Sequence, residues 1–266
     1  MKKQPLAIRG KIRLKEFDPK FCDGKTKEEV AEKTLELTRR IGIIQELLYA
    51  NARQSLLILF QGMDASGKDG AVKRVLEFVN PAGVETSNFK TPSAEELAHD
   101  FLWRVHKAVP RFGNIGVFNR SHYEEVLVVR VLGLRPKKVW QTRYDQINAF
   151  ERILTANGVV LLKFFLHISP AEQADRLRAR LEDPRKNWKF SKTDLEMRRH
   201  WNQFQKAYED VLNRCSPDYA PWHIVPADRK WYRDYVIART VVQRLEDLNL
   251  NWPKPAEDLS GIRIRP

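Results

Sequence analysis

Short apolar runs alternate with helical patterns along the chain. Four runs read as buried strands, at residues 55–60, 115–119, 159–168 and 222–227, and a weaker one covers residues 84–89. Between them apolar residues recur at intervals of three and four, as on one face of a helix. Strands that alternate with helices imply parallel pairing through right-handed crossovers. The pattern therefore predicts a three-layer αβα sandwich around a parallel five-stranded sheet.

Capping residues predict where several helices begin. Thr26, Ser93 and Thr193 each precede a glutamate by three residues, the spacing of a capping box. Ser169 is followed by a proline, which is favoured at the first helical position. The helices expected are one opened by Thr26, one from the loop after residue 60 to about Asn80, one from Ser93 to about Lys107, two near 122–131 and 139–157, one after Ser169, one long helix from Thr193 to about Arg214, and one at 230–248.

The chain reads as one domain with short extensions. It has no internal repeat and no linker rich in glycine or serine. We expect residues 1–25 to form an irregular basic arm, residues 26–250 a single domain, and residues 251–266 a C-terminal tail.

Composition places the chain among ordinary globular proteins, with one bias. Of 266 residues, 42% are hydrophobic and 30% charged. The formal net charge is +13, from 47 basic and 34 acidic residues. Such an excess favours a polyanionic partner, namely nucleic acid, an acidic membrane or a highly phosphorylated substrate. A basic surface that serves only solubility is the alternative.

The remaining composition indicates a cytoplasmic protein. Cys22 and Cys215 are far apart and form no metal or disulfide pattern, which suits a reducing compartment. The basic N-terminus lacks the apolar core of a secretory signal. The longest apolar run is interrupted by Lys163 and is far shorter than the roughly 20 residues of a membrane span.

A candidate phosphate loop, GMDASGKDG at residues 62–70, lies between the first strand and a helix. Gly62, Gly67 and Lys68 occupy the fixed positions of the pattern G-x-x-x-x-G-K. In this context backbone N–H groups and the helix dipole converge on phosphate oxygens. The phosphate-binding residues predicted from the loop and the following helix are Gly62, Ala65, Ser66, Gly67, Lys68, Asp69, Gly70, Lys73 and Arg74.

Two carboxylates accompany this loop. Asp69 stands where a Ser or Thr would place a hydroxyl on Mg²⁺. A carboxylate beside phosphate is repulsive unless a cation lies between them. We therefore expect Asp64 to bind Mg²⁺, with Mn²⁺ as an alternative ion. Asp69 either supports the metal or only begins the helix, where the dipole favours an acid.

A second strand end carries similar polar residues in FNRSHYEE. Asn119 and Arg120 end the third strand and should face the phosphate loop, because the carboxyl ends of parallel strands meet at one edge. Arg120 is suited to clamp a phosphoryl group. Glu124 and Glu125 follow one turn later, where one can reach a metal or a ribose. The alternative is that these two acids are solvated and only stabilise the N-terminus of a helix.

The basic segment at residues 176–192 follows the fourth strand, where nucleotide-phosphorylating kinases carry a mobile lid. A lid brings cations to the transferred group and excludes water. A solvated charged face is the more usual meaning of such a run. The lid residues predicted to bind phosphate are Arg178, Arg185, Lys186 and Lys189. Trp188 either covers a base or anchors the segment.

Several motifs together resemble one family. GMDASGKDG, FNRSHYEEV, DPRKNWKFSKTDLEMRRHW, AYEDVLN and APWHIVPADRKWYR are similar to the family-2 polyphosphate kinases, and the resemblance extends from about residue 27 to 248. It implies a P-loop kinase fold akin to thymidylate kinase, with a helical lid.

The resemblance also implies an activity, the Mg²⁺-dependent, reversible transfer of a phosphoryl group between inorganic polyphosphate and a nucleotide. FNRSHYE and the chain length are similar to the subgroup that acts on both AMP and ADP. Asp64, Lys68 and Arg120 match the family's catalytic phosphate and metal positions, and Asn119 and Glu124 match its nucleotide positions. Glu125 stands where relatives often have Asp, which implies a catalytic metal ligand. The resemblance further implies a homo-oligomer.

Polyphosphate needs a long basic groove, for which Lys73, Arg74, Lys107 and Arg111 are further candidates. We expect neither nucleic acid nor a membrane as partner. Two rival functions stay open: an ATP-dependent nucleoside monophosphate kinase, and a P-loop module that binds RNA without turnover. The Asp69 replacement and the charge of +13 argue against the first rival.

Overall fold

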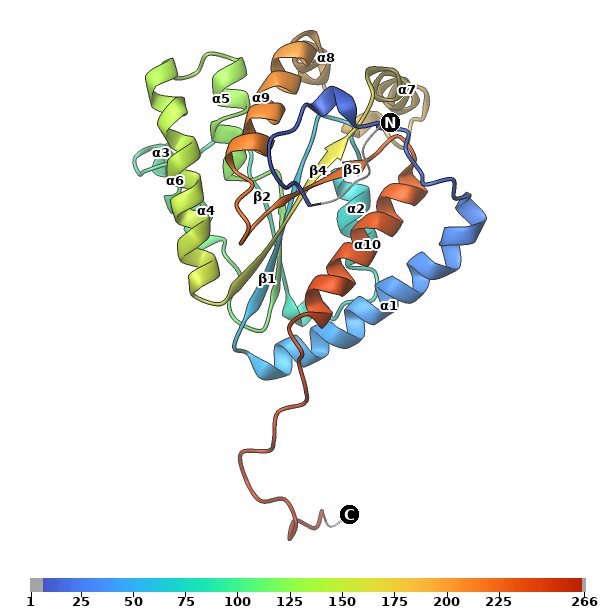
Figure 1. The fold of residues 1–266 in the computed structure, drawn as a ribbon, viewed down its shortest axis with the longest axis vertical. Coiled ribbons are helices and arrows are strands. Elements are labelled where there is room, and N and C mark those ends of the chain that lie inside the picture. The colour runs from blue at the N-terminus through green and yellow to red at the C-terminus, as the bar shows by residue number, and fades with distance from the viewer. Residues whose placement is uncertain (1–6, 265–266) are drawn as a thin grey trace.

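A computed structural model describes residues 7–264, and five parallel strands form its single sheet in the order β2-β3-β1-β4-β5 (Figure 1). The strands are β1 (Ser55–Gln61), β2 (Val84–Asn88), β3 (Ile115–Asn119), β4 (Val159–His167) and β5 (Trp222–Pro226). All four strand pairings are parallel. The predicted five-stranded parallel sheet is confirmed.

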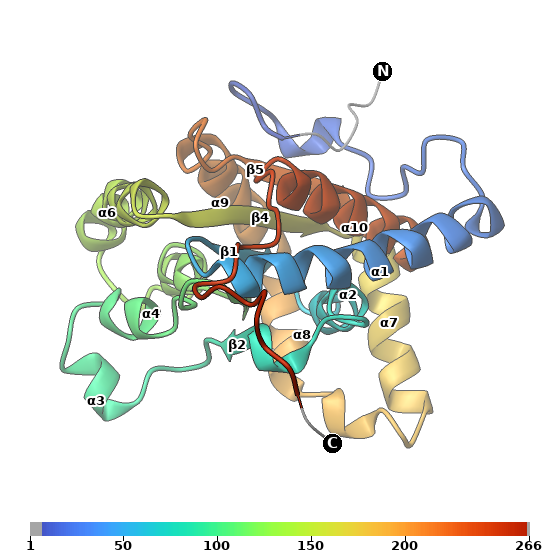
Figure 2. The ribbon, with the colours of Figure 1, turned by 90° about the horizontal axis from the view of Figure 1, so that it is seen from below.

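Helices cover both faces of this sheet and complete the three layers (Figures 1 and 2). One face carries α1 (Lys27–Asn51), α2 (Lys68–Val75) and α10 (Lys230–Glu246). The other face carries α3 (Ala94–Leu97), α4 (Trp103–Lys107), α5 (Val128–Val131), α6 (Lys137–Ala156) and α9 (Trp201–Arg214). Beyond the carboxyl ends of the strands stand α7 (Pro170–Glu182) and α8 (Lys192–Arg199). Short 3₁₀ turns are η1 (Leu14–Glu16), η2 (Pro81–Gly83), η3 (His122–Glu125) and η4 (Asn187–Lys189).

Two of the three predicted capping boxes are present. The side chains of Thr26 and Ser93 accept hydrogen bonds from the N3 backbone, and the N3 glutamates bond back. The third prediction is wrong, because Ser191 rather than Thr193 caps α8. The expected long helix is also two helices, since the backbone leaves the helical conformation at His200 between α8 and α9.

Two further helices are shorter than the sequence suggested. The helix expected from Ser93 to Lys107 is divided into α3 and α4, because the Asp100 carboxylate accepts a 2.9 Å bond from the Leu102 backbone and forms a turn. The helix after the phosphate loop ends at Val75, and residues 76–79 form turns before Asn80 caps η2.

The N-terminal segment is irregular, as expected, but it is not a separate arm. Ile8, Ile12, Leu14 and Phe17 are buried in the main core. The Ile8 backbone N–H donates a 2.8 Å bond to the carbonyl of Trp222 in β5. The first six residues of this predicted segment and the last two of the predicted tail lie outside the described residues. Residues 251–264 extend from the body with exposed side chains (Figure 1).

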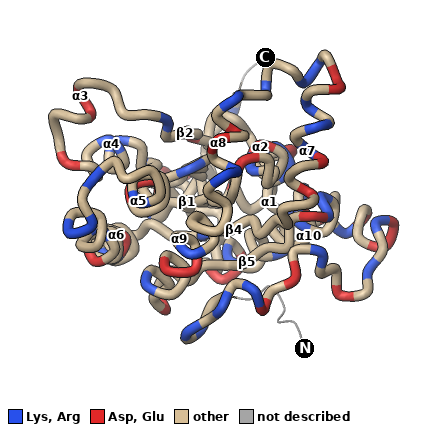
Figure 3. Tube along the Cα trace, turned by 90° about the horizontal axis from the view of Figure 1, so that it is seen from above, with Lys and Arg blue, Asp and Glu red and all other residues tan. Residues whose placement is uncertain are grey.

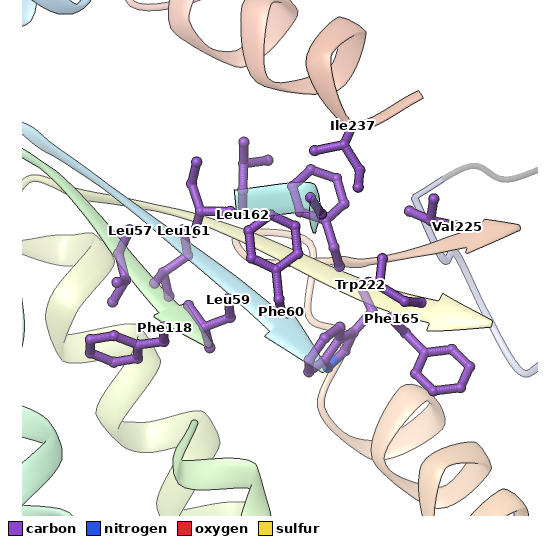
Figure 4. Packing of buried hydrophobic residues seen from close by; sticks show 14 of the residues in the cluster. Leu57, Leu59, Phe60, Phe118, Leu161, Leu162, Phe165, Trp222, Val225 and Ile237 are labelled. Atoms are coloured by element: carbon purple, nitrogen blue, oxygen red, sulfur yellow. The ribbon is translucent and has the colours of Figure 1, made fainter. Parts of the chain in front are cut away.

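The core lies on both faces of the sheet (Figure 4). Every residue of β1 and β4 is buried, as the continuous apolar runs predicted. Phe60 and Phe164 stack with ring centroids 5.5 Å apart. This packing fixes the carboxyl ends of β1, β3 and β4, from which the loops of the candidate site emerge. No helix within residues 7–264 is long and apolar enough to cross a membrane.

Candidate active site

The phosphate loop wraps around the Lys68 side chain. Lys68 is the first residue of α2, and its Nζ donates bonds of 2.8 Å to the Gly62 carbonyl and 3.3 Å to the Met63 carbonyl. Burial lowers the pKa of Lys68, and the nearby Arg120 charge lowers it further. An anion bound in the loop would therefore stabilise the charged form of this lysine.

Two features of the Gly67 position disfavour any other residue. Its φ of +100° lies in the left-handed region, and a Cβ added there would overlap the Arg233 guanidinium. The guanidinium of Arg176 also lies close, 3.4 Å from that Cβ position. Two arginines from distant helices therefore pack against the start of α2.

Asp64 and Arg120 join the ends of β1 and β3. The Arg120 guanidinium donates a 2.7 Å bond to the Asp64 carboxylate, whose side chain is 17% exposed. Burial lowers the pKa of Arg120, but the charges of Glu124 and Asp64 outweigh burial and raise it overall. Arg120 has a φ of +64°, a conformation that costs a non-glycine residue free energy, and such residues cluster at functional sites.

Asp69 orients a neighbouring amide. Asn119 Nδ2 donates a 2.6 Å hydrogen bond to the exposed Asp69 carboxylate. Asp69 is also the second residue of α2, where the dipole favours an acid. Asp69 therefore both stabilises the start of α2 and holds the Asn119 side chain.

The structure separates the two predicted glutamates. Glu124 lies close to Arg120 and Lys68, and burial raises its pKa despite these two cations. It lines a narrow cavity of about 40 Å³ beside Asp64, together with Met197 and Tyr208. Glu125 instead pairs with Arg143, and neither cavity beside Asp64 includes it. The structure therefore does not bring Glu125 to Asp64, contrary to the predicted metal pair, because adjacent residues of the tight η3 turn point in different directions.

The main cavity at this edge has a volume of about 510 Å³. Its lining includes the predicted residues Asp64, Ala65, Gly67, Lys68, Asp69, Gly70, Asn119, Arg120, Lys186 and Lys189. Seen from above, α2, α7 and α8 surround this region, and Lys and Arg positions mark α7 and the segment after it (Figure 3). Gly62 lines the narrow cavity instead, and Ser66 is buried within the loop.

Trp188, expected either to cover a base or to anchor the segment, also lines the cavity. Other cavity residues were missed from the sequence, namely Asn88, Arg176, Ala179, Arg180, Asp194, Lys230 and Arg233. Trp188 and Arg176 fall in the segment that was expected to act as a lid, and Lys230 and Arg233 in the motif PADRKWYR. The sequence thus contained both the basic segment and the motif, but only the tertiary structure shows that these residues line the cavity.

Arg176 braces the loop rather than facing solvent. Its Nη1 donates to the Ala65 and Ser66 carbonyls at 3.0 and 2.9 Å. Its Nη2 donates to the Ala227 and Asp228 carbonyls at 2.5 and 3.1 Å. One side chain of α7 thus connects the phosphate loop to the end of β5.

Several predicted phosphate-binding residues lie outside the cavity. Arg74, Arg178 and Arg185 are ion-paired with Glu77, Asp175 and Asp183 respectively. Lys73 is likewise absent from the lining. Of the groove candidates, Lys107 lies 4.0 Å from the centre of the Trp103 ring, and Arg111 lies 3.7 Å from Glu85. These side chains therefore do not line the cavity at the phosphate loop.

Carboxylates do not form a closed metal cage here. Within residues 7–264 no three His, Cys, Asp or Glu side chains are grouped to hold a metal ion. Asp64 alone presents a carboxylate to both cavities. Mg²⁺ in phosphoryl-transfer sites is commonly held by one or two carboxylates together with substrate phosphates. The residues present fit a metal that is shared with substrate.

The chain is similar to known proteins over nearly its whole length. Residues 24–252 match the family model described as Polyphosphate kinase 2 (PPK2). An AMP/ADP-polyphosphate phosphotransferase of Meiothermus ruber is 48% identical over 259 residues, which cover 96% of each chain. An ADP-polyphosphate phosphotransferase of Rhodopseudomonas palustris is 42% identical over 257 residues, covering 90% of this chain and 88% of the relative.

A solved structure agrees with the fold. Polyphosphate Kinase 2 from Arthrobacter aurescens TC1 superposes with a TM-score of 0.93 at 39% sequence identity. The match covers 96% of this chain and 92% of that one.

Proposed function

Because the chain belongs to the polyphosphate kinase 2 family, we propose that it transfers the terminal phosphoryl group of inorganic polyphosphate to AMP and ADP. The products are ADP and ATP, and the reaction is reversible. The chain is thus a polyphosphate:nucleotide phosphotransferase. The observation that carries the proposal is a cavity that is lined by the phosphate loop, by Arg120 and by a cluster of further cations.

The reaction needs no general base. An oxygen of the acceptor phosphate, already ionised near neutral pH, attacks the terminal phosphorus of polyphosphate. A new P–O bond forms while the bond to the bridging oxygen breaks, and the shortened polyphosphate leaves with that electron pair. Catalysis then consists of alignment and charge neutralisation.

We assign the transferred phosphoryl group to the phosphate loop and Arg120. Lys68 and the N–H groups that begin α2 hold it from one side, and Arg120 clamps it after leaving Asp64. Asn119 and Glu124 lie on the acceptor side, where Glu124 shares the narrow cavity with apolar side chains. Support comes from two bonds, one of 2.8 Å from Lys68 to the Gly62 carbonyl of the loop and one of 2.7 Å from Arg120 to Asp64.

The donor chain runs along the opposite side. Lys186, Lys189, Lys230 and Arg233 line that part of the cavity. Partial burial lowers the pKa of Lys230, and the charges of Arg176 and Arg233 lower it further. Lys230 forms no ion pair within residues 7–264. A polyanion here would offset the mutual repulsion of these cations.

A divalent cation belongs to this reaction, and we propose Mg²⁺, with Mn²⁺ as the alternative. Asp64 would hold it together with oxygens of the substrate phosphates. When bound, the ion neutralises charge on the transferred group. Glu125 is not part of the proposal, because it is paired with Arg143.

We also propose a homo-oligomer in the cytoplasm, with residues 26–250 as the catalytic domain and the N-terminal segment packed on it. The two cysteines are unpaired, which suits a reducing compartment. Nucleic acid is not proposed as a partner, because the cations described above face a cavity at the phosphate loop.

One assay tests the activity directly. Purified protein with AMP, Mg²⁺ and polyphosphate, without ATP, is expected to form ADP and then ATP. Absence of product would contradict the proposal. Phosphorylation of AMP only when ATP is added would identify an ATP-dependent nucleoside monophosphate kinase instead. An inactive protein whose RNA affinity survives Lys68→Ala would identify a binding module.

A further inference from the structure

Lys163 interrupts the most apolar strand of the protein, and the reaction described above does not use it. Its side chain is fully buried in the middle of β4. Nζ donates bonds of 2.5 Å to Glu151 Oε2 in α6, 2.8 Å to the Cys215 carbonyl and 3.0 Å to the Tyr123 hydroxyl. All three donors of the ammonium group therefore have acceptors.

Glu151 is equally buried and connects the lysine to η3. Its Oε1 accepts a 2.8 Å bond from the Tyr123 hydroxyl and lies 3.3 Å from His122 Nε2. Burial raises the pKa of Glu151, but Lys163 and His122 outweigh burial and lower it overall. Lys163, Glu151, Tyr123 and His122 thus form one buried polar cluster, called the Lys163 cluster below.

This cluster holds the turn that carries two site residues. His122 and Tyr123 begin η3, directly between Arg120 and Glu124 in the chain. The turn has a second anchor at Ser121, whose Oγ accepts a 3.1 Å bond from Gln61 Nε2 in β1. The Tyr123 ring also packs edge-on against Trp222, with centroids 4.9 Å apart. Each contact limits movement of the backbone that presents Arg120.

Stability by itself does not call for an ion pair here. Burying two charges is costly, and replacing a buried pair with neutral groups of similar volume is often neutral or stabilising, whereas removing one partner is strongly destabilising. The residues that pair with Lys163 on the flanking strands are Leu59 and Trp222, so an apolar residue would suit this face of the sheet. The directional hydrogen bonds that Glu151 accepts from Lys163 and Tyr123 are what an apolar core would lack.

We propose that the Lys163–Glu151 pair is a positioning device that fixes η3 so that Arg120 and Glu124 meet the transferred phosphoryl group in a single geometry. This inference rests on the proposed phosphotransferase activity. It assigns Lys163 and Glu151 a role in kcat although neither lines the cavities beside Asp64.

The test compares charge-neutral variants with the wild type. In the double variant Lys163→Met/Glu151→Gln, a Gln oxygen still accepts from Tyr123 and no charge is left unpaired. The Cys215 carbonyl loses its lysine donor, so we expect a lower melting temperature in a variant that still folds. The kcat should fall by about 10²-fold, the order of loss for a small misplacement. The KM for polyphosphate should stay unchanged, because the cations of the donor side come from α10 and from the segment after α7. Amide hydrogen exchange should be faster at residues 124–127.

A core variant outside the Lys163 cluster serves as the control. Val241→Ala shortens a buried side chain of α10, far along the chain from η3, and should lower the melting temperature while kcat is retained. If the double variant does not fold, Tyr123→Phe, which removes one hydroxyl, should lower kcat more than Val241→Ala does. A folded double variant with wild-type kcat, or equal kcat losses in Tyr123→Phe and Val241→Ala, overturns the inference. An inactive wild type would instead contradict the proposed function.

Discussion

The Arg120 guanidinium lies 2.7 Å from the Asp64 carboxylate, so the residue suited to clamp phosphate is paired with the residue suited to hold a metal. Each neutralises the other in the absence of substrate. Binding of a phosphate and a cation would supply each with a new partner of opposite charge. The first prediction tests this exchange.

Asp64→Asn keeps an oxygen that can accept from Arg120 but removes the negative charge. We expect kcat to fall by about 10²–10³-fold, the order of loss when one charge-stabilising group is removed at a transition state. The Mg²⁺ concentration that gives half of the maximal rate should rise, because Asp64 would hold the ion that the substrate phosphates share. Steady-state kinetics over a range of Mg²⁺ concentrations would measure both. In the matched variant Asp69→Asn, which keeps the bond from Asn119, we expect less than about a tenfold loss. Equal losses of kcat in Asp64→Asn and Asp69→Asn would contradict distinct roles for the two carboxylates.

Lys230→Met should weaken binding of the polyphosphate donor without affecting binding of the nucleotide acceptor. We expect the KM for polyphosphate to rise by about tenfold, equivalent to about 1.4 kcal/mol, while the KM for AMP stays within about twofold. Lys73→Met is the control, because it removes the same charge from outside the cavity. Initial rates at low and high salt would show whether the effect is electrostatic. Similar KM values for polyphosphate in Lys230→Met and Lys73→Met would refute the proposal that polyphosphate binds along Lys230.

Gly67→Ala should disable the phosphate loop, since its Cβ would overlap the Arg233 guanidinium. We expect a loss of stability of about 1–3 kcal/mol together with loss of polyphosphate binding. Gly133 is the matched position, because its φ is also positive, at +65°, but no other heavy atom lies within 4 Å of an added Cβ. Gly133→Ala should therefore retain binding. Urea unfolding and direct binding measurements would separate the two effects, and intact binding in Gly67→Ala would disprove the steric argument.

His167 should make the fold sensitive to acid. Burial lowers its pKa to about 4, although the Phe17 backbone and Asp228 act in the opposite direction. The unfolded chain, with a pKa near 6.5, takes up a proton first as the pH falls, so stability is lost below about pH 6.5. This residue should account for about 2 kcal/mol between pH 7 and pH 5.

Urea unfolding of the wild type and of His167→Gln at both pH values would measure that difference. His223, whose pKa burial also lowers to about 4, remains in the variant and contributes a residual dependence. The same acid-induced loss in both proteins would show that His167 is not responsible.

Local patterns were enough for the fold and the centre of the site. A strand, two glycines at fixed spacing and a helix start define the phosphate loop, because its turn and helix start follow from residues close in the sequence. Continuous apolar runs identified β1 and β4, since strands buried on both faces have no polar side. The order β2-β3-β1-β4-β5 then brought Asn119 and Arg120 beside the loop, as the carboxyl ends of parallel strands require.

The tertiary structure decided those contacts that the spacing of residues in the sequence does not specify. Arg176 and Arg233 reach the loop from α7 and α10, and no local pattern specifies contacts across so many residues. Glu124 rather than Glu125 lies beside Arg120, because η3 is a tight 3₁₀ turn whose orientation depends on the buried Lys163 cluster. The N-terminal residues looked basic and irregular, but Ile8 and Leu14 are covered once the sheet edge at β5 is in place.

The sequence by itself therefore determined the alternation of strands and helices, the phosphate loop and the family motifs, because these depend on short-range periodicity and backbone preference. Only the folded chain decided which cations line the cavity and which lie outside it. Lys73 and Lys230 carry the same charge, yet only Lys230 lines the cavity. That difference comes from the packing of whole helices on the sheet, which fixes the direction of each side chain.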